Sequence, residues 1–82
     1  MTVKIIKVKD KTVWLAIDQL KIYTSDEEMI ERENEFLCYF KMTEPSLLVL
    51  GELFRDEDGR PKLFTSIDSA IEIAKFELNK RS

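Results

Sequence analysis

Four carboxylates are spaced so that they could do chemistry together: Glu27, Glu28, Glu31 and Glu35. On a helix, separations of three, four and eight residues would gather them on one acidic face. Such a face could hold a metal ion or imitate a phosphate-rich surface. Hard cations usually take their oxygen ligands from a loop, however, so a solvated helix face is the simpler interpretation.

The sequence contains no histidine and a single cysteine, Cys38. A chain without histidine lacks the commonest general base and the commonest transition-metal ligand. It also lacks the usual activator of a serine or cysteine nucleophile. Cys38 lies in the apolar run 36–40, which is typical of a buried thiol rather than a reactive one. We therefore predict a protein that is not an enzyme and that binds no cofactor or transition metal.

Lysines recur near the N-terminus, at positions 4, 7, 9 and 11. With Trp14 and Tyr23 as nearby aromatic residues, they could contact phosphates and bases, so a nucleic-acid-associated regulator is the alternative function. The lysines fall on both faces of a predicted strand, which weakens a phosphate-binding stripe. Lysines on an outer strand also protect a sheet against aggregation.

Two stretches with the same chemistry, KIYTSDEEMIE and KLFTSIDSAIE, begin at Lys21 and Lys62. Each has a Thr-Ser pair that follows a short apolar strand, Thr24-Ser25 in the first and Thr65-Ser66 in the second. A carboxylate lies three residues beyond each threonine, which is the spacing of a helix capping box. The sequence therefore predicts an internal repeat of residues 1–41 and 42–82. A coincidence between two helix starts is the competing explanation.

The first half predicts strands over residues 3–9 and 12–17, a turn at Asp10-Lys11, and a helix over residues 26–41. The helix is predicted because Met29, Phe36 and Phe40 share one helical face. The competing prediction ends the helix near residue 34 and makes residues 35–42 a strand, because Phe, Cys and Tyr favour strands.

The second half predicts a strand within residues 46–54, a turn at Asp58-Gly59, a short strand over 62–64 and a helix over 67–80. The helix has an apolar stripe at helical spacing, made of Ile67, Ala70, Ile71, Ala74 and Leu78.

Two apolar residues of this C-terminal helix, Ile73 and Phe76, lie opposite the apolar stripe. An apolar pair on a face that should be wet often marks a contact surface, although a helix buried on both sides in the monomer would show the same pattern. Trp14 would be exposed on a sheet face that no helix covers. Ile73, Phe76 and Trp14 together form the predicted interface for self-association.

Residues 58–70, DGRPKLFTSIDSA, resemble the strand-turn-strand-helix ending of small accessory proteins encoded on plasmids and other mobile elements. In those proteins Gly-Arg-Pro, a following Phe-x-Ser and then Asp-x-Ala recur. The resemblance implies a mobile-gene or plasmid-maintenance setting and brings no functional residues with it.

These patterns predict one α+β domain over residues 1–82, with two ββα units, an antiparallel sheet of about four strands and both helices on one face. A chain of 82 residues has a narrow stability margin, which association would widen. We expect a cytoplasmic location, because neither a signal peptide nor an apolar run of about 20 residues is visible. The predicted function is a non-enzymatic interaction or regulatory module, acting as a homodimer or on an unidentified protein partner.

Overall fold

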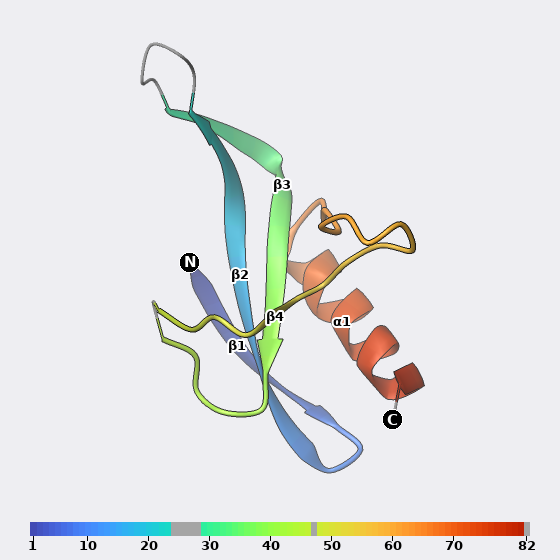
Figure 1. Cartoon of the computed structure of the whole chain (residues 1–82). Helices are drawn as coiled ribbons and strands as arrows, with labels where there is room; N and C mark the ends of the chain where they lie inside the picture. The colour runs from blue at the N-terminus through green and yellow to red at the C-terminus, as the bar shows by residue number, and fades with distance from the viewer. Residues whose placement is uncertain (24–28, 47, 82) are drawn as a thin grey trace.

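The computed structural model describes residues 1–23, 29–46 and 48–81 and shows an antiparallel sheet with a helix beside it (Figure 1). The strands lie in the sheet in chain order, β1-β2-β3-β4. The elements are β1 (Thr2–Val8), β2 (Lys11–Tyr23), β3 (Met29–Lys41), β4 (Glu52–Leu53) and α1 (Ile67–Arg81). The α+β class is therefore confirmed. The predicted ββα-ββα arrangement is wrong, because the described chain has a simple strand meander and one helix.

A two-residue turn joins β1 to β2. Val8 pairs with Lys11, and the residues between them, Lys9 and Asp10, have φ angles of 47° and 68°. Two consecutive positive φ angles are typical of a type I′ turn, whose twist matches that of the flanking strands. The predicted N-terminal hairpin is confirmed, with its turn one residue earlier than predicted.

Residues 29–41 form β3, so the helix predicted over residues 26–41 is wrong. Phe36, Cys38 and Phe40 all belong to the core or pack against it. On a helix, Phe36 and Cys38 would point about 200° apart, whereas alternate residues of a strand share one face. Only a strand can bury all three side chains on the same side. The strand that was the competing prediction for the end of this segment is the element that forms.

The hairpin of β2 and β3 extends beyond the rest of the sheet (Figure 1). The pairing of β1 with β2 ends where Thr2 meets Ile17, so from Asp18 onward β2 has β3 as its only described strand neighbour. This two-stranded ribbon contributes to the length of the molecule, 47 Å along its longest axis.

The helix α1 packs on one face of the sheet through two fully buried alanines, Ala70 and Ala74. Small side chains at these positions let the helix backbone approach the strands closely. Residues from β1, β2, β3 and the connection before α1 complete the core. Its members are Ile6, Val8, Val13, Leu15, Ile17, Cys38, Phe54, Phe64, Ala70 and Ala74.

Two phenylalanines that lie outside helices and strands, Phe54 and Phe64, are the largest fully buried side chains of the described residues. The Phe54 ring lies 4.6 Å from that of Phe40 and 6.3 Å from that of Phe64, centroid to centroid. Phe64 is also held to Phe36 of β3 by two backbone hydrogen bonds of 2.9 Å. The connection between β4 and α1 therefore fills part of the core that a second helix was predicted to fill.

The turn predicted at Asp58-Gly59 is confirmed. The Oδ1 atom of Asp56 accepts hydrogen bonds from the backbone N–H groups of Asp58 and Arg60, both 3.0 Å long. Gly59 has a φ of 82°, a conformation that favours glycine. The strands predicted on either side are mostly absent, because β4 has two residues and the return segment makes only isolated bridges.

The predicted internal repeat is wrong, because the segments that follow the two Thr-Ser pairs form different elements. Thr24 and Ser25 lie outside the described residues, and the chain continues from Met29 as β3. Thr65 and Ser66 precede α1. The similarity of the two stretches is therefore confined to their sequences, and it is not evidence for two copies of one structural unit.

The cap of α1 is formed by Ser66. Its Oγ atom accepts a hydrogen bond of 3.0 Å from the backbone N–H of Ser69, while Thr65 is exposed just before it. The N-cap therefore lies one residue later than the Thr65-x-x-Asp68 capping box that the sequence predicts.

We expect Ser66→Ala to lower the free energy of unfolding by about 1 kcal/mol, because the amide of Ser69 loses its acceptor. The matched control Thr65→Ala should change it by no more than about 0.5 kcal/mol. Urea denaturation followed by circular dichroism measures both. Equal losses in the two variants would contradict the assignment of the cap.

The two glycines provide a second test. Both have positive φ, 112° at Gly51 and 82° at Gly59, but a Cβ at Gly51 would meet the backbone of Phe40 while one at Gly59 meets nothing. Gly59→Ala should therefore cost about 1 kcal/mol, and Gly51→Ala about 2–4 kcal/mol. Thermal and urea unfolding of both variants checks this order. The reverse order would show that the close approach of residue 51 to β3 is wrong.

Candidate interaction surface and pocket

The predicted acidic helical face does not form. Glu31 and Glu35 lie on the strand β3, and Glu27 and Glu28 lie outside the described residues. Residues four apart are separated by about 13 Å along a strand, against about 6 Å along a helix, so the helical spacing no longer gathers these four carboxylates. Within residues 1–23, 29–46 and 48–81, no group of three metal-ligating side chains is found.

The Cys38 side chain is fully buried in the core between the sheet and α1. Its Sγ atom lies 3.8 Å from the backbone carbonyl oxygen of Tyr39. Removal from water disfavours the thiolate, and this raises the pKa of the Cys38 thiol from 9.0 to about 12. A thiol that stays protonated at neutral pH is a poor nucleophile and a poor metal ligand.

We expect Cys38 to resist a thiol reagent such as dithiobisnitrobenzoate in the folded protein at pH 8 and to react fully in 6 M guanidinium. The raised pKa also means that burial of the thiol stabilises the fold below the unfolded pKa of about 9, and that this contribution is lost as the pH rises toward 12. Absorbance during labelling measures the reaction. Rapid labelling of the folded protein would contradict the buried position.

The three residues of the predicted interface lie in different environments. Ile73 is half-buried and packs against the core, so it belongs to the monomer. Phe76 is 66 % exposed on α1. Trp14 is half-buried on the sheet face away from α1, because its neighbours Val13 and Leu15 point into the core. The structure does not bring the three together on one surface.

The sheet face away from α1, here called the outer face, carries apolar residues along β1. Ile5 is 61 % exposed and pairs across the strands with Trp14, and Val3 is exposed beside it. Ala16 lies between Val3 and Tyr39 on the same face and is fully buried. The apolar surface of the outer face is therefore concentrated at the β1 side of the sheet.

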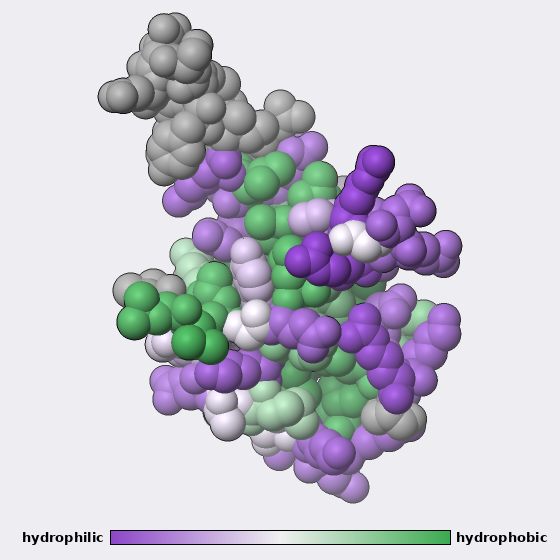
Figure 2. Space-filling model, in the orientation of Figure 1, coloured by the Kyte–Doolittle hydropathy of each residue, from purple (hydrophilic) through white to green (hydrophobic). Residues whose placement is uncertain are grey.

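A second exposed apolar group belongs to the chain between β3 and β4. Leu48 is 95 % exposed, and Val49 is also exposed. Figure 2 shows hydrophobic side chains gathered on the side of the molecule where this segment lies in Figure 1.

The two edges of the sheet differ. On one side β1 has β2 as its only strand partner in the described chain, so one edge of its seven-residue backbone is unpaired. On the other side the edge is short and covered. β4 has two residues, Phe54 donates to the carbonyl of Cys38, and Phe64 pairs with Phe36. The β1 edge is therefore the open one.

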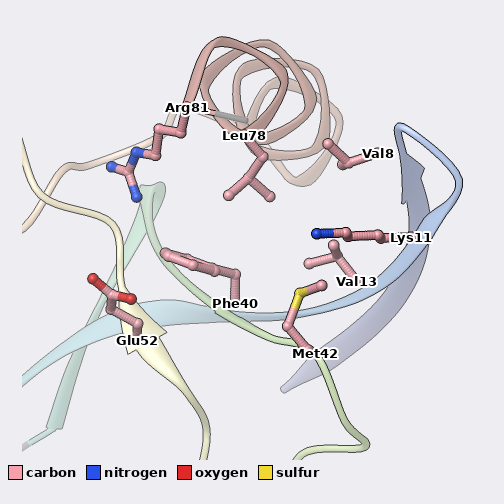
Figure 3. Close-up of a pocket in the computed structure, with 8 residues that line it drawn as sticks. All are labelled: Val8, Lys11, Val13, Phe40, Met42, Glu52, Leu78 and Arg81. Carbon is pink, nitrogen blue, oxygen red and sulfur yellow. The ribbon is translucent and has the colours of Figure 1, made fainter.

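A pocket lies where the C-terminal end of α1 passes over the β1–β2 turn and the end of β3 (Figure 3). Its volume is about 330 Å³. Apolar and charged side chains line it together: Val8, Lys11, Val13, Phe40, Met42, Glu52, Leu78 and Arg81. The guanidinium carbon of Arg81 lies 5.6 Å from the ring centroid of Phe40 and 5.8 Å from that of Phe54. These cation–π contacts hold the Arg81 side chain at the rim of the pocket.

Comparison of the chain with protein-family models, curated proteins and solved structures finds no match in any of the three. The resemblance of residues 58–70 to mobile-element accessory proteins stays a prediction. In the described part of the chain, no helix has the length and apolar character needed to cross a membrane.

Proposed function

We propose that the protein is a small non-enzymatic interaction module that acts as a homodimer, in which the β1 strands of two copies pair antiparallel. The observation that supports this most directly is the unpaired edge of β1. An edge strand presents a row of N–H and C=O groups that can pair with another chain. Pairing two such edges about a twofold axis would join the sheets of the two copies into one.

The charge pattern of β1 favours one register. Ile5 is the middle residue of Thr2–Val8, so a twofold axis at Ile5 pairs the whole strand with its copy. In that register Lys4 lies opposite Ile6 and Lys7 lies opposite Val3, so no lysine faces a lysine directly. An axis at Lys4 or Lys7 would place like charges opposite one another, which destabilises a strand pair.

The same register extends the apolar surface of the outer face. Ile5 of one copy would lie beside Ile5 of the other, and Trp14 flanks each of them on the next strand. The result is a continuous row of four apolar side chains across the junction. Aromatic and β-branched neighbours on adjacent strands stabilise such pairs, so the exposed Ile5 gains contacts on both sides.

The lysines of the N-terminal hairpin give no comparable support to the nucleic-acid alternative. Lys4 has the strand parity of the core residues Ile6 and Val8, whereas Lys7 has the parity of Ile5, so they point to opposite faces. Lys7 also donates a 2.9 Å hydrogen bond to Thr12 Oγ1. A cytoplasmic and mobile-element setting belongs to this proposal and rests on the sequence alone.

We expect the wild-type protein to be dimeric at tens of micromolar, and Ile5→Lys to raise the dimer dissociation constant about tenfold or more, because it places two lysines opposite each other on the axis. Sedimentation equilibrium measures the constant, and circular dichroism verifies that the variant is folded. The matched control is Phe76→Lys, which changes a similarly exposed apolar residue on α1 and should leave the constant unchanged.

Two results would overturn the proposal. One is a wild-type protein that remains monomeric at several hundred micromolar. The other is dissociation by Phe76→Lys but not by Ile5→Lys, which would move the interface from the β1 edge to α1.

A further inference from the structure

We propose that the pocket beneath the end of α1 binds a small monoanionic carboxylic acid with an apolar body. This site is separate from the proposed dimer and does not depend on it. Known ligand pockets have volumes of about 300–1,000 Å³, so a pocket of about 330 Å³ suits a small ligand. Its walls come from α1, the β1–β2 hairpin and the end of β3, which belong to one packed core.

The apolar residues of the pocket surround the space in which the body of the ligand would lie. Figure 3 shows Leu78 and Met42 on opposite sides, with Phe40 to one side and the two valines to the other. Val8 and Val13 are almost fully buried and belong to the core, whereas Met42 is 52 % exposed. A ligand in this space would contact a preformed apolar wall and would cover the Met42 side chain.

Two cations accompany the apolar walls. The Lys11 ammonium extends into the space between Leu78 and Met42, and Arg81 lies on the opposite side, above Phe40 (Figure 3). No salt bridge between described residues involves either cation. Its contacts with the rings of Phe40 and Phe54 restrict the positions of Arg81, which reduces the conformational freedom that it would lose when it binds an anion.

The third charged residue, Glu52, limits the charge of the ligand. It lies on the same side of the pocket as Arg81, and Phe40 is nearer the centre of the pocket than either of them (Figure 3). Two cations and one carboxylate leave a single net positive charge, which one carboxylate neutralises. A dianion such as a phosphate monoester would place its second negative charge near Glu52, and like charges in a partly desolvated pocket repel. The charge balance therefore favours a monoanion.

An amide-resolved NMR titration with phenylbutyrate tests the site, with the neutral phenylbutanamide as the matched probe. We expect the carboxylate to shift the amides of residues 11, 40–42, 52 and 78–81, and the neutral amide to bind about tenfold more weakly, because it lacks the charge-assisted hydrogen bonds. The opposite end of α1, around residues 65–68, should not respond.

Charge variants test the roles of the side chains. Lys11→Gln should weaken phenylbutyrate binding about tenfold, whereas Glu52→Gln should strengthen it about twofold to fivefold by removing a repulsive charge. The controls are Lys4→Gln, on the same hairpin but away from the pocket, and Lys80→Gln, next to Arg81 but not in the lining. Both should bind phenylbutyrate as the wild-type protein does.

Three results would overturn the proposal. The first is the absence of localised amide shifts with millimolar phenylbutyrate. The second is equal affinity for the carboxylate and the neutral amide. The third is weaker phenylbutyrate binding in Glu52→Gln, which would mean that Glu52 supports the bound anion and that the proposed charge balance is wrong. A folded spectrum of each variant, recorded without ligand, shows that the comparison concerns binding and not stability.

Discussion

A single helix has to cover one face of a much longer sheet. The rest of the structure depends on this difference in length between α1 and the strands. The helix α1 has 15 residues and is about 22 Å long, whereas β2 has 13 residues and spans about 43 Å. Two buried phenylalanines, Phe54 and Phe64, fill the space beside the helix. Where α1 ends above the β1–β2 turn, the pocket remains between its last residues and the sheet. At the other end of β2 and β3, a ribbon continues without a helix.

The sequence predicts the fold well where local chemistry and tertiary packing agree. The helix at the C-terminus has small residues at helical spacing and a serine cap, and the first hairpin alternates apolar and polar residues around a tight turn. Residues 29–41 could not be assigned in the same way. Met29, Phe36 and Phe40 fit a helical face, and only the pairing with β2 shows that Cys38 must lie on the same side as its aromatic neighbours. Partners distant in the chain, not local propensity, decide that segment.

The candidate sites were harder to predict than the fold. The acidic cluster depended on a helix that does not form. The helical spacing alone placed Ile73 opposite the core, because it takes no account of the connection that packs beside α1. Alternation along one strand is enough to place Trp14 on the face opposite Val13 and Leu15. It could not show how far that face is covered, since Trp14 is half-buried and Ala16 on the same face is fully buried. The pocket could not be predicted from sequence, since Lys11, Met42 and Arg81 come from three distant parts of the chain. No spacing rule relates them.

The extended ribbon of β2 and β3 has a consequence for how the protein opens. Near Ile17 these strands are part of the core, so we expect their backbone amides to exchange with solvent only when the whole domain unfolds. Beyond the pair of Gln19 and Phe36 the register of the two strands shifts, and neither β1 nor Phe64 pairs with the ribbon there. An isolated two-stranded hairpin is at best marginally stable in water. Its amides can therefore exchange through local opening. The pair of β2 and β3 thus contains two cooperative units, with the boundary at the register shift between Gln19 and Lys21.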